Sequence, residues 1–103
     1  MYYTGAGIQI NSEEAAKWFR KAAEQGHSLA QKNIGVMYYT GIGVGRDLIM
    51  AASWFRKAAL QGYSTAQANL GIMYENGYGV VKDFELAVHW YRKSANQENA
   101  RGQ

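Results

Sequence analysis

The chain has 103 residues, of which 48% are hydrophobic and 18% charged, and its formal net charge is +3. This length fits one domain, and this composition is typical of a folded chain. Because cysteine is absent, disulfides and thiolate metal sites are excluded. The longest apolar run is far shorter than the roughly 20 residues of a membrane-spanning helix.

The predicted elements are all helices. In chain order we expect a helical stub at residues 1–4 and helices near residues 12–24, 28–40, 48–60, 64–76 and 84–96. In the segment 48–60, residues at helical spacing form one apolar face: Ala51, Trp54, Phe55, Ala58 and Ala59. The segment 28–40 has a similar stripe: Ala30, Ile34, Met37 and Tyr38, with Gly35 where another helix can approach closely. No strand is required.

The sequence repeats every 36 residues. "MYYTGAG", "MYYTGIG" and "MYENGYG" begin at residues 1, 37 and 73, and "AAKWFRKAAEQG", "AASWFRKAALQG" and "AVHWYRKSANQE" begin at residues 15, 51 and 87. Residues 1–36 agree with residues 37–72 at 21 positions. We refer to the helices at 28–40 and 64–76 as A helices and to those at 12–24, 48–60 and 84–96 as B helices. This repetition predicts stacked helix pairs.

A tryptophan stands at the same place in each copy, at Trp18, Trp54 and Trp90. A helix pair of this size cannot bury its own apolar face, so neighbouring pairs must stack. We therefore expect all three tryptophans to lie between adjoining pairs. Replacing any one of them should cost roughly 3–5 kcal/mol.

Glycines recur before each B helix, as in "YYTGIGVGRD" from Tyr38 to Asp47. A phosphate-binding loop would also use glycines, but it occurs once per site, between a strand and a helix. Recurrence between helices favours a joint, in which the first glycine adopts a positive φ and the second allows close approach. Further recurring residues support it: Val44 and Val80 as apolar plugs, and Asn11, Asp47 and Asp83 as helix caps.

The phrase "AxxNLGxMYxxGxGVxxDxxxAxxWxRKAxxQG" resembles the Sel-one-like repeat (SLR) family, which is related to the tetratricopeptide repeats. The resemblance covers essentially the whole chain. It implies an all-α fold, an α/α solenoid of antiparallel helix pairs in a right-handed superhelix. It also implies a non-enzymatic scaffold or adaptor that binds other proteins on the concave face of its A helices, often in bacteria, with no cofactor.

The repeat divides the chain into one repeat domain, residues 1–103. We expect a partial repeat at 1–27, repeats at 28–63 and 64–97, and a degenerate tail at 98–103, where Glu98 replaces the glycine that ends earlier B helices. The incomplete ends suggest a fragment of a longer chain, or self-association through exposed terminal repeats. A cytoplasmic location is expected if the chain is complete, and a periplasmic or secreted one if a signal peptide was removed.

The expected binding groove follows positions where the copies differ on a shared face of the A helices. These residues are Leu29, Lys32, Val36 and Tyr39 in one copy and Thr65, Ala68, Ile72 and Glu75 in the next, with Tyr3 preceding them. Spacings of 3, 4 and 3 place each set on one stripe. We expect Tyr3 and Tyr39 to anchor a peptide or helix, and Lys32 and Glu75 to set its polarity. The alternative is ordinary packing or solvent positions.

A second surface is the basic ridge formed by three pairs, Arg20–Lys21, Arg56–Lys57 and Arg92–Lys93. It suits nucleic acid or an acidic protein. The favoured interpretation, however, is a solvated face with cations near helix ends, and nucleic acid is not the expected partner.

The sequence offers no catalytic group. His27 and His89 lie at different phases of the repeat, and Glu85 with His89 lacks a third metal ligand. Ser28 and Ser64 precede the A helices, where we expect their hydroxyls to cap free amides. The identity of the partner does not follow from the sequence.

Overall fold

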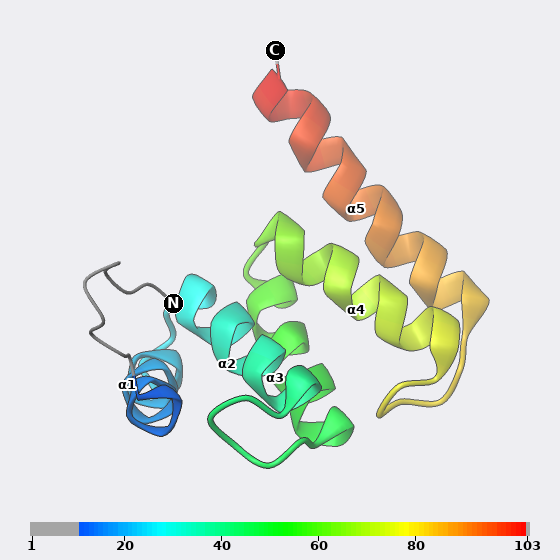
Figure 1. Ribbon diagram of the computed structural model, residues 1–103. Helices are drawn as coiled ribbons and strands as arrows, with labels where there is room; N and C mark the ends of the chain where they lie inside the picture. Colours follow the sequence, from blue (N-terminus) through cyan, green and yellow to red (C-terminus); the bar gives the residue numbers. More distant parts are fainter. Residues whose placement is uncertain (1–10, 103) are drawn as a thin grey trace.

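The computed structural model describes the backbone of residues 11–102 and the side chains of residues 11–97. Within this range it contains five α-helices and no strand: α1 (Ser12–Glu24), α2 (Ser28–Thr40), α3 (Leu48–Leu60), α4 (Ser64–Asn76) and α5 (Phe84–Gly102). Each helix packs against the next one along the chain, as Figure 1 shows from α1 in blue to α5 in red. The all-α helical repeat is confirmed, with α2 and α4 as A helices and α1, α3 and α5 as B helices. The predicted stub at residues 1–4 lies outside the described residues.

The B helices begin at the predicted side-chain caps. The Asn11 side chain accepts hydrogen bonds from the amides of Glu13 and Glu14 at 2.9 and 3.2 Å. Asp47 and Asp83 accept a bond from the third amide after them, at 3.0 and 3.1 Å. These bonds satisfy amides that the helix itself leaves free.

The A helices begin differently from the prediction. His27 and Tyr63 occupy the N-cap positions with extended backbone, and neither side chain caps the helix. Ser28 and Ser64 are already the first helical residues. The cap position is the one from which a side chain reaches the second and third amides of the helix, so the expected role of these serines as N-caps is wrong.

The glycine joints have the predicted geometry in both described copies. Gly41 and Gly77 end the A helices with φ of 79° and 71°, and their amides bond the carbonyls of Met37 and Met73. Gly43 also lies close to the preceding B helix, since a Cβ on it would fall 2.5 Å from the Ser12 carbonyl oxygen. Only glycine meets both requirements without strain.

The hydrophobic core consists of two clusters of buried residues, each with small and large side chains. One cluster contains Ala16, Ala23, Ala30, Ile34, Met37 and Trp54, and the other joins α3, α4 and α5. Within each pair the A helix presents a glycine to an aromatic ring of the B helix. A Cβ on Gly35 would lie 2.7 Å from Phe55 Cε1, and one on Gly71 would lie 2.8 Å from the Tyr91 ring. The predicted close approach at Gly35 is therefore confirmed.

The expectation that all three tryptophans are buried is wrong for Trp18. Trp54 and Trp90 are each 8% exposed, whereas Trp18 is 66% exposed. Trp54 packs in the cluster formed by α1 and α2, and Trp90 in the one formed by α3 and α4. A buried tryptophan thus has the A helix of its own pair and the preceding B helix beside it. No described helix precedes α1, so Trp18 lacks this cover.

The last B helix is longer than predicted. The sequence placed its end near residue 96, but α5 continues to Gly102. At the matching place the earlier B helices are followed by Gly26 and Gly62, which have φ of 96° and 91°. Glu98 cannot adopt that conformation cheaply, so the helix continues, and its final turns project beyond the other helices (Figure 1).

Candidate protein-interaction surface

The predicted groove residues lie on the A helices at positions that the core leaves accessible. Leu29, Val36 and Ile72 are 53%, 37% and 39% exposed. Among the polar or small members, Thr65 and Glu75 are exposed, and Lys32, Tyr39 and Ala68 are partly buried. Tyr3 lies outside the described residues. We call the eight described positions the A-helix stripe.

Tyr39 links this stripe to the loop after the next A helix. Its ring lies 6.1 Å from that of Tyr78, with a tilt of 56° between the rings. Its carbonyl oxygen accepts a bond from Arg46 Nε at 3.0 Å. The ring of Tyr39 thus already contacts another aromatic ring within the fold, and the bond from Arg46 connects the backbone at this position to the A–B loop.

Glu75, at the other end of the stripe, is held within its own helix pair. Its carboxylate accepts a hydrogen bond from the Tyr91 hydroxyl at 2.6 Å. Burial, followed by this bond and the negative charge, raises the pKa of Tyr91 to about 12. Glu75 therefore has a structural contact, which the sequence did not indicate, in addition to its expected role in polarity.

Two of the three arginines in the basic pairs contact the following A helix. Arg20 donates to the Tyr38 hydroxyl at 2.6 Å and Arg56 to the Tyr74 hydroxyl at 3.5 Å. The neighbouring lysine Lys57 lies 5.6 Å from the centre of the Trp54 ring. Side chains of the predicted ridge thus have defined contacts within the fold.

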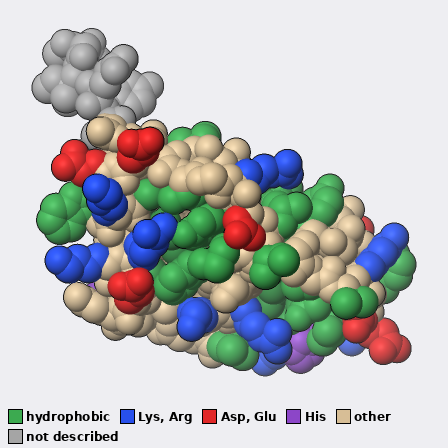
Figure 2. Space-filling model, turned by 90° about the horizontal axis from the view of Figure 1, so that it is seen from below, with side chains coloured by type: hydrophobic (Ala, Val, Ile, Leu, Met, Phe, Trp, Pro, Cys, Tyr) green, Lys and Arg blue, Asp and Glu red, His purple; other side chains and the backbone are tan. Residues whose placement is uncertain are grey.

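The structure also shows an exposed apolar edge that the sequence analysis missed. Its residues belong to the A–B loops and the first turns of the B helices: Ile42, Ile49, Tyr78, Val81 and Phe84. Figure 2 views the molecule from below, the side of these loops, and hydrophobic side chains gather there among scattered acidic and basic groups. Ile42 and Tyr78 lie 36 positions apart, so their recurrence was a signal available in the sequence.

Two recurring pairs of hydrogen-bonded glutamines are a second feature that the sequence analysis missed. Buried Gln31 donates to the Ala23 carbonyl at 3.1 Å and accepts a bond from Gln61 at 2.8 Å. Gln67 repeats both bonds, with the Ala59 carbonyl and with Gln97, at 3.1 and 2.9 Å. Because these glutamines join one helix pair to the next, their recurrence is explained by stacking.

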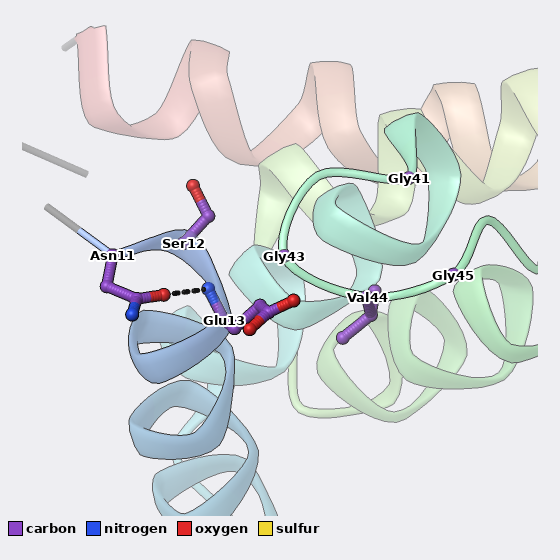
Figure 3. A pocket seen from close by; sticks show the side chains of 7 residues that line it. All are labelled: Asn11, Ser12, Glu13, Gly41, Gly43, Val44 and Gly45. Carbon is purple, nitrogen blue, oxygen red and sulfur yellow. Dashed lines mark hydrogen bonds between the residues drawn. The ribbon is translucent and has the colours of Figure 1, made fainter.

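A hollow lies between the start of α1 and the loop after α2 (Figure 3). It is lined by Asn11, Ser12, Glu13, Gly41, Gly43, Val44 and Gly45. Asn11 already occupies the amides that an anion would require, and the Glu13 side chain is acidic. This hollow is the surface of the joint and does not suit a phosphate.

His89 lies beside its neighbour Trp90, with the ring centres 5.1 Å apart and nearly perpendicular. Within residues 11–97 no group of three potential His, Cys, Asp or Glu metal ligands comes together. None of the helices described is long and apolar enough to cross a membrane.

Solved structures support the same architecture. A Sel1 repeat protein from Oxalobacter formigenes is 41% identical, with a TM-score of 0.87 over 93% of this chain and 73% of that one. Helicobacter pylori cysteine rich protein B is 28% identical, with a TM-score of 0.81 over 88% of this chain and 68% of that one.

A third structure is c5321, a protective antigen of uropathogenic Escherichia coli that displays an SLR fold. It is 42% identical, with a TM-score of 0.86 over 90% of this chain. This chain spans about a fifth (20%) of the length of c5321. No curated protein sequence matched.

The family comparison covers nearly the whole chain. The Sel1 repeat profile matches residues 1–27, 28–63 and 64–99. Sel1 repeats generally serve as non-catalytic modules for protein–protein interaction. The 36-residue period, the glycine joints and these matches agree: the chain belongs to the Sel1 repeat family.

Proposed function

We propose that this chain is a non-enzymatic scaffold module that binds a partner protein or peptide through the A-helix stripe. The observation that carries the proposal is the exposure of Leu29, Val36 and Ile72 on the A helices. The other large aliphatic side chains of these helices are buried: Ile34, Met37, Leu70 and Met73. Folding gains nothing from leaving aliphatic side chains in water, whereas binding gains from covering them.

The composition of the stripe indicates the chemistry of the partner. Three aliphatic residues and Tyr39 favour an apolar helix or extended peptide. Lys32 is the cation of the stripe, and Glu75 is engaged by Tyr91. A partner with an acidic residue facing Lys32 therefore fits better than a basic one.

Binding of nucleic acid or an acidic protein to the basic ridge is the rival proposal. The bonds of Arg20 and Arg56 to tyrosines give these arginines a structural role, so the ridge is explained without a ligand. The two proposals differ in salt dependence, because contacts to phosphates weaken steeply as salt rises.

Affinity capture with paired variants tests the stripe. The variant Tyr39→Ala with Lys32→Glu should lose the partner, since it removes the aromatic anchor and reverses the charge. Lys17→Glu, the same charge reversal on the exposed side of α1, is the matched control and should retain the partner. Circular dichroism establishes that all three proteins fold alike.

Two results count against the proposal. Equal recovery of the partner by the stripe variant and by Lys17→Glu would show that the stripe does not bind. Loss of binding when the charge of Lys21 or Lys93 is reversed, together with an affinity that falls steeply as salt rises, would favour the ridge.

A further inference from the structure

Asn76 is the last residue of α4, and its exposed side chain stands directly before Gly77. The chain has five other asparagines, and each of them precedes a residue with a side chain. Glycine has no Cβ, so the backbone nitrogen after Asn76 is sterically accessible. In the other two copies of the repeat this place belongs to Thr4 and Thr40, which have no side-chain amide. The chemistry of an Asn–Gly pair is therefore confined to this one position.

That chemistry is the loss of ammonia from the side chain, and it needs no reagent except water. The Gly77 backbone nitrogen gives up its proton to the solvent and attacks Asn76 Cγ, so that an N–Cγ bond forms. The Cγ–Nδ2 bond breaks, and the side-chain nitrogen takes up a proton and leaves as ammonia. Water then opens the five-membered succinimide ring at one of its two carbonyls, which gives aspartate or, when the backbone bond opens, isoaspartate.

Three features protect Asn76 while the joint is closed. The Gly77 amide donates to the Met73 carbonyl, so its proton is engaged. The Asn76 Nδ2 donates to the Ile72 carbonyl at 2.9 Å, which directs the side chain back along the helix. Asn76 also has the backbone conformation of a helical residue, whose ψ does not bring the next nitrogen onto Cγ. The reaction therefore requires that the end of α4 opens first.

The joint after α4, residues 77–83, determines how often this protection is lost. Its backbone is held by bonds from the Tyr78 amide to the Met73 carbonyl and from the Asp83 amide to the Tyr74 carbonyl, each of 2.9 Å. Val80 packs against the core cluster of α3, α4 and α5 and is only partly buried. A helix end held by so few contacts opens at a lower free energy than the whole chain unfolds. Local opening of this joint therefore frees Asn76 while the core stays folded.

We propose that Asn76 is a site of spontaneous deamidation whose rate is set by local opening of the joint after α4. The product does not restore the closed joint. Aspartate cannot donate to the Ile72 carbonyl, and its charge lies at the C-terminal end of a helix, where the helix dipole disfavours an anion. Isoaspartate adds an atom to the backbone directly before Gly77. The reaction also places a negative charge beside Glu75, at the end of the A-helix stripe, whatever that stripe binds.

Mass spectrometry measures the reaction at a single residue. The full chain and a synthetic peptide of residues 70–82 are incubated in the same mildly alkaline buffer, and the chain is then cut with trypsin. The tryptic fragment of residues 58–82 contains both Asn76 and Asn69, so Asn69, which precedes Leu70, is the internal control and should stay unmodified. We expect deamidation of Asn76 to be about ten- to a hundredfold slower in the folded chain than in the peptide, which is too short to form a stable helix.

Two matched variants show whether the opening is local. Val80→Ala removes contacts of the joint after α4 and should make deamidation of Asn76 several times faster. Val44→Ala makes the same change in the joint after α2, residues 41–47, and should leave the rate at Asn76 unchanged. Circular dichroism establishes that both variants fold like the parent.

The variant Asn76→Thr tests the consequence for the fold. It introduces the residue of the earlier copies, where the Thr40 hydroxyl donates to the Val36 carbonyl at 2.9 Å. The bond at the end of α4 is thus kept, and the side-chain amide is removed. After the incubation the urea midpoint of the parent should have fallen, whereas that of Asn76→Thr should be unchanged.

Three results would overturn the proposal. The first is an equal rate of deamidation in the folded chain and in the peptide, because the joint would then give no protection. The second is the absence of product from the folded chain after about a hundred half-lives of the peptide, because the joint would then stay closed. The third is equal acceleration by Val80→Ala and Val44→Ala, because unfolding of the whole chain would then free the site.

Discussion

Replacement of the three tryptophans by alanine should separate the buried positions from the exposed one. An aromatic side chain of this size buries up to about 250 Å². At about 25 cal/mol per Å², burying nine tenths of that area is worth at most roughly 6 kcal/mol. Part of this contribution remains with alanine, so Trp54→Ala and Trp90→Ala, both 8% exposed in the parent, should each cost roughly 3–5 kcal/mol.

Trp18→Ala should cost much less. Trp18 is 66% exposed, so it buries about a third of its surface instead of about nine tenths. Scaling the cost in the same proportion gives roughly 1–2 kcal/mol. The comparison is internal, because the three residues occupy the same position in the repeat.

Trp54 permits a finer test. Its indole Nε1 is buried without a hydrogen-bond partner in the described structure. A buried unpaired donor costs about 1–3 kcal/mol. Trp54→Phe removes this cost while keeping an aromatic ring, so it should be less destabilising than Trp90→Phe.

Urea unfolding followed by circular dichroism at 222 nm measures these differences without relying on tryptophan fluorescence. We expect three parallel curves. Trp18→Ala should have the highest urea midpoint, and Trp54→Ala and Trp90→Ala should have lower midpoints that lie close together. A loss for Trp18→Ala as large as that for Trp54→Ala would refute the reasoning, because it would require Trp18 to be packed as deeply as Trp54.

Four other substitutions, one of them a control, test individual contacts. Gly35→Ala places a Cβ 2.7 Å from Phe55 Cε1 and should lower the midpoint of urea unfolding by an amount equivalent to about 1–3 kcal/mol, whereas Gly45→Ala meets nothing within 4 Å and should be neutral or slightly stabilising. Gln31→Glu replaces the amide donor to the Ala23 carbonyl with a buried carboxylate, so unfolding at pH 7 should show a loss of roughly 2–4 kcal/mol that shrinks near pH 4, where the protonated acid donates again. The pKa of Tyr91 is raised from 10.0 to about 12, so the folded state favours the neutral phenol and the stability of the parent should fall between pH 10 and 12. Thermal melts of Tyr91→Phe should show a smaller fall over this range. A fall in Tyr91→Phe as large as in the parent would contradict the assignment.

The starts of the B helices and the ends of the A helices were predictable because local residues determine them. Asn11, Asp47 and Asp83 supply caps, and the glycines after the A helices supply the positive φ that ends them. These signals act over a few residues and can be read without knowledge of the neighbours. The same local logic, applied at Glu98, explains why α5 continues.

The exposure of Trp18 was not predictable from its position in the repeat. A tryptophan is buried only if a helix lies on each side of it, so its environment depends on the neighbours and not on its own segment. The glutamine contacts were missed for a related reason. Gln31 and Gln67 recur in the sequence, but their partners belong to preceding and following helices, 8 and 30 residues away.

The candidate surface could be predicted only in part. Helical spacing assigns Leu29, Val36 and Ile72 to one face, and the structure leaves them exposed. The bond from Tyr91 to Glu75 and the contact between Tyr39 and Tyr78 depend on packing between elements. Spacing within one helix carries no information about such contacts.

Site-specific photo-crosslinking tests most directly whether the A-helix stripe is the binding surface. A benzophenone amino acid is introduced at Val36 and at Ile72 and, as the matched control, at exposed Ser53 on the outer face of α3. The account predicts that positions 36 and 72 crosslink the same partner protein and that position 53 does not. Crosslinking of that partner from position 53, with none from 36 or 72, would contradict it.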